Sequence, residues 1–238
     1  HANTINVNLG YDFITDMLVL EFAIDDSKIE VHSKENPWLK RAAQSLAEAL
    51  RLATSKKLDV DFTELVTGYR LRTGPESSYV DIYLYDSLSS GAGYAASVAE
   101  IIDDVLLDMR QMLSSCDCDS ACSKCLKHYR NQYVHGLLDR HAAIELLDWG
   151  INGELAQQKN FEEQVALLRP LVNILNKSGY EVSIMDNIIT VQSKYAEKNI
   201  EIYPAMWVEP EKEGTIFVSD MYVKYAKPYA VRKISNNI

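Results

Sequence analysis

Four cysteines crowded into one short segment are the residues of this sequence best suited to chemistry. They lie in the segment SSCDCDSACSKCLKHY, with the spacing C-x-C-x3-C-x2-C, and they are all the cysteines of the chain. The four are Cys116, Cys118, Cys122 and Cys125. Because no cysteine is left elsewhere for a long-range bridge, the pattern indicates a metal-ligand cluster rather than a disulfide framework.

Zinc is the metal that this cluster predicts. A tetrahedral Zn²⁺ takes four thiolates at about 2.3 Å, and the small residues between the cysteines let a short loop fold its sulfur atoms inward to that distance. Four thiolates leave no position for water, so the expected zinc is structural, and Lys124, Lys127 and Arg130 can screen its negative charge. An iron–sulfur cluster and a set of metal-free thiols are the alternatives. His128 or His135 could also replace one thiolate.

A loop with two glycines, DSLSSGAGY at residues 86–94, joins an expected strand to an expected helix. Free N–H groups at such a junction can hold a phosphate. The loop lacks the Gly-Lys-Ser/Thr ending of a phosphate-binding P-loop, because Tyr-Ala-Ala follows the second glycine. We therefore expect a tight turn in which Gly91 and Gly93 adopt positive φ.

A second candidate for chemistry is the stretch DNIITVQSK near the C-terminal end. It resembles the acid-then-(Glu/Gln)-x-Lys pattern of magnesium-dependent, restriction-like nucleases, with Asp186, Gln192 and Lys194 in the corresponding positions. Asp186 and Gln192 stand only six residues apart on one expected hairpin, which favours an ordinary solvated hairpin over a metal site. No Gly-x-Ser-x-Gly nucleophile elbow or His-Glu-x-x-His helix occurs in the chain.

The elements that must position the cysteines follow from hydrophobic periodicity. Apolar residues at three- and four-residue steps predict helices over residues 39–53 and 94–113, the second of which leads directly into the cysteines. Alternating or clustered branched residues predict strands over residues 15–22 and 79–85. A further helix is expected over residues 140–149. These elements indicate an α/β (α+β) fold, a mixed sheet with flanking helices and a four-cysteine zinc loop.

Beyond Gly150 and Gly153 the pattern starts again, which predicts a boundary between a domain at residues 1–155 and a small α+β unit at residues 156–238. In this unit we expect a helix over 161–175, a hairpin of strands 181–185 and 188–192 around Asp186-Asn187, and strands over 199–203 and 215–219. The basic tail, Lys224, Lys227, Arg232 and Lys233, is expected to be a solvated face.

Composition limits the class of protein. The chain has 238 residues and a formal net charge of −10, so its average field repels phosphate backbones and any nucleic acid must meet a local basic patch. The sequence contains no run of about 20 apolar residues, the length that a membrane-spanning helix needs. These features and the free cysteines predict a cytoplasmic protein. His1 in place of an initiating methionine suggests a fragment or a processed chain.

Three stretches together resemble a known family. The opening LGYDFITDMLVLEF, the loop YLYDSLSSGAGYA and the segment CDCDSACSKCLKHYRNQYVHGLLDR are similar to the MrfA-type zinc-binding (MZB) domain, the C-terminal domain of bacterial and fungal DExH DNA helicases that also occurs in DISARM-type phage defence. The resemblance covers roughly residues 7–149. It implies that the four cysteines hold zinc. It also marks six further positions as a family framework: Asp86, Gly91, Gly93, Asn131, Asp139 and Arg140.

The resemblance implies an accessory role. The chain contains no Walker lysine loop, no Asp-Glu-x-His box and no arginine-finger motif, so it is not expected to hydrolyse ATP alone. The leading hypothesis is a non-catalytic zinc-binding domain that packs against helicase motor domains in the same or a partner chain and meets DNA through that parent complex. A magnesium-dependent nuclease in the C-terminal unit and a protein-interaction adaptor are the alternatives.

Overall fold

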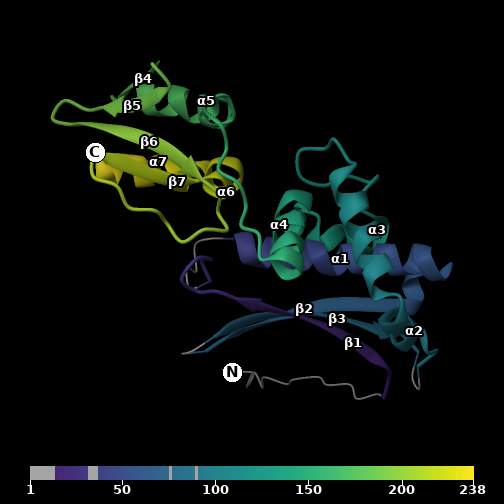
Figure 1. The fold of residues 1–238 in the computed structure, drawn as a ribbon. Helices are drawn as coiled ribbons and strands as arrows, with labels where there is room; N and C mark the ends of the chain where they lie inside the picture. Colours follow the sequence, from purple (N-terminus) through teal and green to yellow (C-terminus); the bar gives the residue numbers. More distant parts are fainter. Residues whose placement is uncertain (1–13, 32–36, 75–76, 89–90) are drawn as a thin grey trace, which may run out of the picture.

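The computed structural model describes residues 14–31, 37–74, 77–88 and 91–238. Two sheets lie at opposite ends of the molecule, each with helices packed on it (Figure 1). This arrangement confirms the expected α+β class. The start of the first family-like stretch, before residue 14, and Ser89-Ser90 of the glycine loop lie outside the described residues. Within the described part of the chain, no helix combines the length and apolar character needed to cross a bilayer.

The first sheet has three antiparallel strands in the order β1-β3-β2. Strands β1 (Met17–Ile24) and β3 (Ser78–Asp86) agree with the sequence-based expectation, with Phe22 opposite Val80. Strand β2 (Leu65–Thr73) was not expected. Its arginines and a central glycine obscure the apolar period, and only pairing with β3 makes the segment a strand.

Helix α1 (Trp38–Leu58) crosses the inner face of this sheet, as its three- and four-residue apolar period predicts (Figure 1). The face that it buries is made of small and branched residues: Ala42, Ala43, Leu46, Ala47, Leu50 and Ala53. The helix ends at Asp59, which adopts a left-handed conformation with φ 53°. Alanines let the backbone approach its neighbours closely, so α1 forms the centre of the first hydrophobic core.

The prediction of one helix over residues 94–113 is wrong in one respect, because the segment forms two helices. Helix α2 (Tyr94–Glu100) and helix α3 (Ile102–Ser114) meet at Ile101, whose φ of −121° and ψ of 22° are not helical. Helix α2 contacts β1 and β3, whereas α3 contacts α1 and α4. The break lets each half pack against a different partner, which local periodicity cannot anticipate.

Asp86 fixes the connection between β3 and α2. Its fully buried carboxylate accepts hydrogen bonds from the N–H groups of Ala92 at 2.6 Å, Tyr94 at 3.1 Å and Ala95 at 2.9 Å. Gly91 and Gly93 have φ of 71° and 82°, as the tight turn requires. The carboxylate therefore occupies the position that a phosphate would need at this helix N-terminus.

After the cysteine segment the chain forms a short 3-10 helix, η2 (Tyr129–Val134), and then α4 (Arg140–Asn152). Helix α4 lies against α1 and α3, as Figure 1 shows. It ends at Gly153, whose φ is 69° and whose N–H donates to the carbonyl of Trp149 at 2.8 Å. The helix predicted over residues 140–149 is thus confirmed and slightly longer.

The second sheet has four strands in the order β4-β5-β6-β7, with β6 and β7 parallel and the other pairs antiparallel. The strands are β4 (Glu181–Met185), β5 (Ile188–Gln192), β6 (Glu197–Tyr203) and β7 (Thr215–Ser219). Asp186 and Asn187 turn the predicted hairpin with φ of 52° and 60°. All four strands were expected, because a two-residue turn of this kind is encoded locally.

Three helices complete this unit. They are α5 (Phe161–Lys177), α6 (Asp220–Tyr225) and α7 (Lys227–Asn237). Helices α5 and α7 contact each other and share a second hydrophobic core with the four strands. Only α5 was expected from the sequence, because α6 and α7 are short and carry the basic tail.

The two units are joined by more than the connecting chain. Ile29 pairs with Trp207 in an isolated antiparallel bridge, and Glu30 donates its N–H to the carbonyl of Met206 at 3.0 Å. Met206 and Met221, both late in the sequence, are buried in the first hydrophobic core. The proposed division near residue 155 is therefore crossed by shared packing, and the boundary itself stays a prediction.

A cavity of about 330 Å³ lies where the two units meet. Charged residues from both units line it: Asp119, Asp139, His141, Glu145, Lys159, Glu163, Asp220 and Lys224. Glu145 accepts a hydrogen bond from the Trp38 indole. Burial, with the nearby carboxylate of Asp220, raises the pKa of Glu145 to about 8, although Lys159 opposes the shift. The surroundings of this carboxyl therefore favour its protonated form.

Replacing Asp86 by alanine tests the turn. The substitution removes the acceptor of three backbone N–H groups and should lower the free energy of unfolding by about 2–3 kcal/mol in urea denaturation. Glu100→Ala, an exposed change in the same helix, should stay within about 0.5 kcal/mol of the parent. Equal stability of the two variants would contradict the role given to Asp86.

The pKa of Glu145 predicts a pH dependence of stability. An unfolded glutamate releases its proton near its ordinary pKa, whereas the folded one keeps it up to about pH 8. Its contribution to the free energy of unfolding should therefore fall as pH rises from about 5 to 8, by up to about 1.4 kcal/mol per pH unit. Glu145→Gln should remove this part of the slope, measured by urea denaturation across that range.

The control for this experiment is Glu162→Gln, an exposed change on α5. We expect the Glu145 variant to gain stability relative to the parent at pH 8 and to match it near pH 5. Parallel pH profiles for the parent and both variants would show that Glu145 does not carry the effect.

Candidate metal centre

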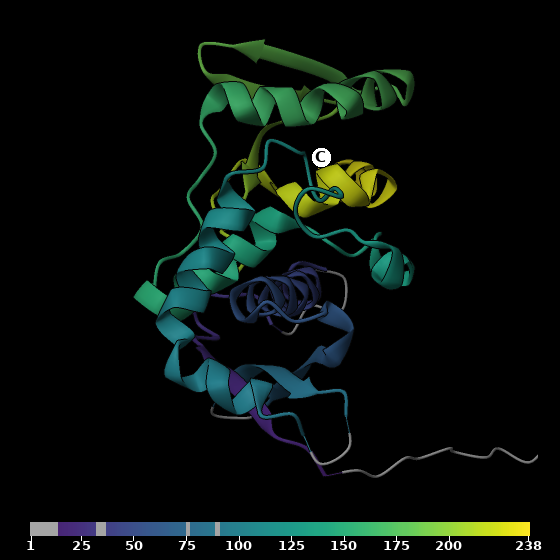
Figure 2. The ribbon, with the colours of Figure 1, turned by 90° about the vertical axis from the view of Figure 1, so that its right-hand side faces the viewer.

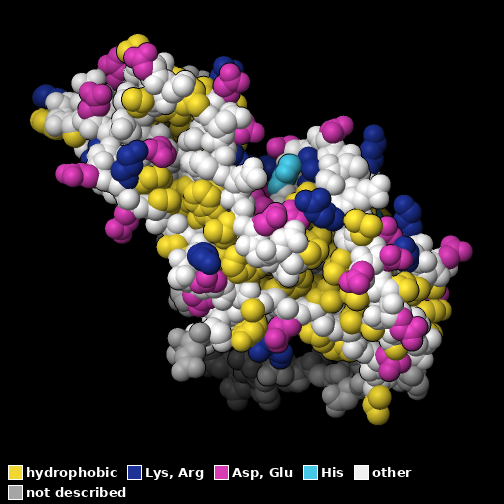
Figure 3. Space-filling model, viewed as in Figure 1, with side chains coloured by type: hydrophobic (Ala, Val, Ile, Leu, Met, Phe, Trp, Pro, Cys, Tyr) yellow, Lys and Arg dark blue, Asp and Glu magenta, His cyan; other side chains and the backbone are white. Residues whose placement is uncertain are grey.

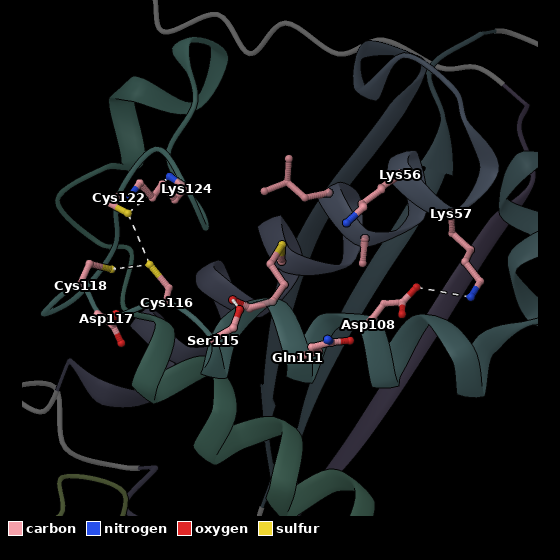
Figure 4. Close-up of a pocket in the computed structure, with 13 residues that line it drawn as sticks. Lys56, Lys57, Asp108, Gln111, Ser115, Cys116, Asp117, Cys118, Cys122 and Lys124 are labelled. Carbon is pink, nitrogen blue, oxygen red and sulfur yellow. Dashed lines mark hydrogen bonds and ion pairs between the residues drawn. The ribbon is translucent and has the colours of Figure 1, made fainter.

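The four cysteine sulfurs converge at the end of α3. The Sγ–Sγ distances are 3.5 Å for Cys116–Cys118 and Cys116–Cys122, 3.6 Å for Cys118–Cys125 and 4.0 Å for Cys122–Cys125. All four sulfurs lie within 4.8 Å of one another. Figure 4 shows the side chains of Cys116, Cys118 and Cys122 pointing toward one another. The short loop therefore folds its thiols inward, as its spacing predicts.

These distances fit a single tetrahedral metal ion. Four thiolates at about 2.3 Å from one zinc stand about 3.8 Å apart, within the range found here. In an iron–sulfur cluster the thiolates bind different irons separated by bridging sulfides, which holds the sulfurs farther apart. The geometry favours a mononuclear centre over a cluster. Zinc and a single iron share this geometry, so the metal itself follows from the chemistry of the donor set and from the family described below.

Backbone N–H groups face two of the sulfurs. Cys122 donates its N–H to the sulfur of Cys125 at 3.2 Å, and Lys124 donates to the sulfur of Cys122 at 3.4 Å. The Lys124 N–H, together with hydrogen bonds from the neighbouring thiols, lowers the pKa of the Cys122 thiol to about 7. Burial, with the neighbouring sulfurs, raises the pKa of Cys118 to about 12. Four negative thiolates this close would repel one another, and a bound dication removes that repulsion.

Arg140 holds the cysteine loop onto the helices. Its Nε donates to the carbonyl of Cys118 at 2.8 Å and its Nη1 donates to the carbonyl of Leu113 at 3.0 Å. Its backbone N–H reaches the carbonyl of Ser120 at 2.8 Å. One buried guanidinium thus ties the end of α3 to the loop, a role that the sequence resemblance marked without explaining.

Asn131 does the same on the far side of the loop. Its Nδ2 donates to the carbonyl of Leu126 at 2.9 Å, and its Oδ1 accepts the N–H of His128 at 2.9 Å. The ring Nε2 of His135 lies 2.8 Å from the same oxygen. Asn131 is almost completely buried. The segment that follows Cys125 is therefore locked in place by a side chain that satisfies several polar groups at once.

Asp139 links the loop region to the C-terminal unit. Its Oδ1 caps α4 by accepting the N–H groups of His141 and Ala142, and its own N–H donates to Ser45 Oγ at 2.7 Å. Its Oδ2 accepts the hydroxyl of Tyr225 at 2.6 Å and lies 3.4 Å from Lys224 Nζ. The framework positions thus all have structural roles in this protein.

The histidines do not join the metal centre. His128 Nε2 lies 3.2 Å from a carboxylate oxygen of Glu48, and His135 Nε2 is bonded to Asn131 and to the carbonyl of His128. Among the described residues, the four cysteines are the only group of three or more Cys, His, Asp or Glu side chains arranged to hold a metal. The alternative in which a histidine replaces a thiolate has no support in this geometry.

A groove of about 800 Å³ borders the cysteines (Figure 4). Its walls come from the C-terminal ends of α1 and α3 and from the cysteine loop. Lys57 forms ion pairs with Asp104 and Asp108 along one wall, while Lys56 and Lys124 are exposed at its edge. The groove reaches the sulfurs from one side, but all four tetrahedral positions are already supplied by thiolates.

The nuclease residues are not brought together. Asp186 lies in the tip of the β4–β5 hairpin, and Gln192 lies at the other end of β5, opposite Glu181. Five residues of extended strand separate them by roughly 15–17 Å. Lys194 is exposed beyond the strand. The structure provides no shared metal position for these three side chains.

The basic tail is only partly the solvated face that was expected. Lys224 pairs with buried Asp139, and Lys233 pairs with Glu209. Lys227 and Arg232 are exposed. The expectation failed for two of the four residues because helices α6 and α7 fold back on the rest of the chain, which the local sequence does not reveal.

The fold and the thiolate cluster define a zinc-binding α+β domain. The sequence model of the MrfA Zn-binding domain family matches residues 46–126, a stretch that contains the later part of α1, the first sheet's β2 and β3, and all four cysteines. Over these residues the chain is similar to the MrfA Zn-binding domain. The family's zinc and the clustered sulfurs agree, so zinc is the cofactor.

One curated relative extends the likeness over nearly the whole chain. The Druantia protein DruE of Escherichia coli (strain UMEA 4076-1) is 36% identical over 233 residues, which cover 90% of this chain and 12% of that protein. The chain thus spans about an eighth of the length of this relative. The match includes the C-terminal unit, which the MrfA Zn-binding domain model does not reach.

Two solved structures match part of the chain weakly. The DUF1998 helicase MrfA bound to DNA has a TM-score of 0.39 and 14% identity, covering 60% of this chain and 26% of that one. MrfA bound to DNA and AMPPNP has a TM-score of 0.37 and 15% identity, covering 59% and 23%. At TM-scores this low, nothing about function follows from the likeness.

Replacing Arg140 by alanine tests how the loop is held. Loss of its bonds to Cys118 and Leu113 should weaken zinc retention by about tenfold, measured by competition with a chromogenic chelator, because residues that orient metal ligands typically contribute 10–100-fold. Arg169→Ala, an exposed arginine on α5, should leave retention unchanged. Equal retention in both variants would remove Arg140 from the centre's support.

Proposed function

We propose that this chain is a non-catalytic accessory domain of a larger ATP-dependent DNA helicase that acts in phage defence or DNA repair. In this proposal Cys116, Cys118, Cys122 and Cys125 are the zinc ligands, and the metal stabilises the loop between α3 and α4. The parent motor domains lie in the same or a partner polypeptide, in the cytoplasm, and DNA is engaged through that assembly.

The observation that carries the proposal is the closed thiolate set. Four sulfurs within 4.8 Å of one another can fill the coordination sphere of zinc, so no site remains for a water or substrate ligand. A zinc of this kind contributes folding free energy rather than Lewis-acid chemistry. Thiol ligands without disulfides also accord with a reducing compartment.

The choice of parent protein is supported by the relatives. MrfA, which gives its name to the matched domain, is named a helicase, and DruE is named a Druantia protein. The chain corresponds to a small part of DruE, so a motor elsewhere in the polypeptide or in a partner is compatible with its length. The activity, substrates and partners of the whole protein are therefore part of the proposal.

A protein-interaction adaptor is the second candidate function. Several large apolar side chains are exposed on the described surface, among them Met17 and Val19 on β1 and Met185 and Ile188 on the β4–β5 hairpin. Such residues are typical of surfaces that contact other proteins. The nuclease alternative has no comparable observation in its favour.

Metal analysis of the purified chain tests the zinc assignment. We expect about one zinc per chain, and loss of both zinc and cooperative unfolding in a Cys116→Ser, Cys118→Ser double variant, because the metal supplies folding free energy. Ser115→Ala with Ser123→Ala, changed in the same segment, should retain zinc. Iron in place of zinc, or no bound metal, would overturn the assignment.

The accessory role is tested in the complete protein that carries this chain. The double cysteine variant should retain most ATP hydrolysis by the motor and lose DNA unwinding or protection against phage, because the motor's own residues are untouched. Full retention of unwinding after zinc is lost would overturn the accessory role without affecting the zinc assignment.

A further inference from the structure

Two tyrosines are unusually exposed just beyond the cysteine loop. Tyr129 and Tyr133 lie four residues apart in η2 and have 83% and 82% of their surface exposed. Tyrosine is intermediate among residue types in its tendency to be buried, so two exposed rings four residues apart are informative. Figure 2 shows η2 as a short teal helical turn at the right, standing away from the neighbouring helices.

The exposed rings stand on a backbone segment that is held in place by hydrogen bonds. Asn131, between the two tyrosines, is anchored by its bonds to Leu126 and His128. The ring of His128 packs edge-on against Phe62 with a centroid separation of 4.7 Å. A buried anchor that holds exposed aromatic rings preorganises them, which reduces the conformational entropy lost on binding.

The segment that carries the tyrosines is basic in an acidic chain. Residues 124–138 contain Lys124, Lys127 and Arg130 and no acidic residue, whereas the whole chain carries a formal charge of −10. On the face drawn in Figure 3, by contrast, acidic and basic side chains are interspersed. A local positive patch is what an acidic protein needs to meet a phosphate backbone.

Arg51 of α1 extends this patch. The guanidinium groups of Arg51 and Arg130 lie 5.0 Å and 5.9 Å from the centroid of the Phe62 ring. Arg130 and Tyr133 are close enough to act electrostatically on Arg51. The carboxylates of Glu48 and Asp61 also act electrostatically on Arg51, and Glu48 lies 3.2 Å from His128 Nε2.

We propose that this aromatic–basic surface, made of Tyr129, Tyr133, Arg51, Lys127 and Arg130, binds single-stranded DNA. Bases stack on the two tyrosines, and the cations contact the phosphates. An exposed ring can stack only on the face of a base that is itself accessible. In a duplex the base faces are covered by neighbouring bases, so a single strand fits this surface better. The choice of DNA over RNA rests on the proposed function as part of a DNA helicase. The stacking of bases on the tyrosines is argued from the structure alone.

The zinc loop positions this surface. Only Leu126 and Lys127 separate Cys125 from the segment that Asn131 anchors, and Leu126 is completely buried. Ordering of the four thiolates by metal therefore fixes the start of η2. The metal acts here as a support for the DNA contact and takes no part in chemistry.

Fluorescence anisotropy of a labelled oligodeoxythymidylate of about 20 nucleotides tests the inference on the zinc-loaded chain. Tyr129→Ala and Tyr133→Ala should each weaken binding by roughly 5- to 100-fold, the range for loss of one base–aromatic stack. Tyr129→Phe should bind nearly as the parent does, because it keeps the ring. Arg130→Ala should reduce the salt dependence by about one phosphate contact.

Tyr195→Ala is the matched control, since Tyr195 is also highly exposed, at 87%, but lies in the C-terminal unit. It should leave binding unchanged. A zinc-loaded, folded chain that does not bind the strand, or that binds equally after loss of both η2 tyrosines, would overturn the inference and leave the zinc assignment standing. Tighter binding of duplex DNA or of an oligouridylate would also overturn the choice of single-stranded DNA.

Discussion

The structure depends on a pair of adjacent residues at the start of α4. Asp139 caps that helix, receives the hydroxyl of Tyr225 from the C-terminal unit and donates its own N–H to Ser45 of α1. Arg140 ties the carbonyl of Cys118 to the end of α3. Both residues are buried, so each lost bond would leave an unsatisfied polar group. Two consecutive positions thus connect the cysteine loop, three helices and the second unit.

The metal centre holds the cysteine loop, the segment that Asp139 and Arg140 connect to the helices. The segment from Ser115 to Leu138 contains little regular structure beyond η2, and the residues of it that are buried in the core are Ala121, Cys125, Leu126 and Leu138. Four thiolates on one ion replace the missing hydrophobic packing, as is common where a loop is too short to bury its own core. Asn131 then carries this order to η2, so the exposed tyrosines stand on a fixed base.

The C-terminal unit has a hydrophobic core of its own and also contributes to the first. Met206 and Met221 enter the core around α1, and the charged cavity containing Glu145 lies between the two units. The likeness to DruE covers both units, which accords with their packing as one body. The hairpin of β4 and β5 and the outer face of β1 carry exposed apolar side chains, which the proposed function leaves available for a partner.

Features that are encoded within a few consecutive residues could be predicted from the amino-acid sequence. The spacing of Cys116 to Cys125 predicted the thiolate cluster, the apolar period predicted α1, and Asp186-Asn187 predicted a hairpin turn, because each is encoded within a few residues. The resemblance marked the family framework positions, but the contacts that they make could not be derived from spacing.

Tertiary structure decided the rest. Strand β2 exists because β3 pairs with it, and the break at Ile101 exists because α2 and α3 pack on different partners. Lys224 is drawn from solvent by Asp139, some 85 residues earlier in the chain. Such contacts join segments far apart in sequence, and their free energy overrides local preference, so no local pattern could have revealed them.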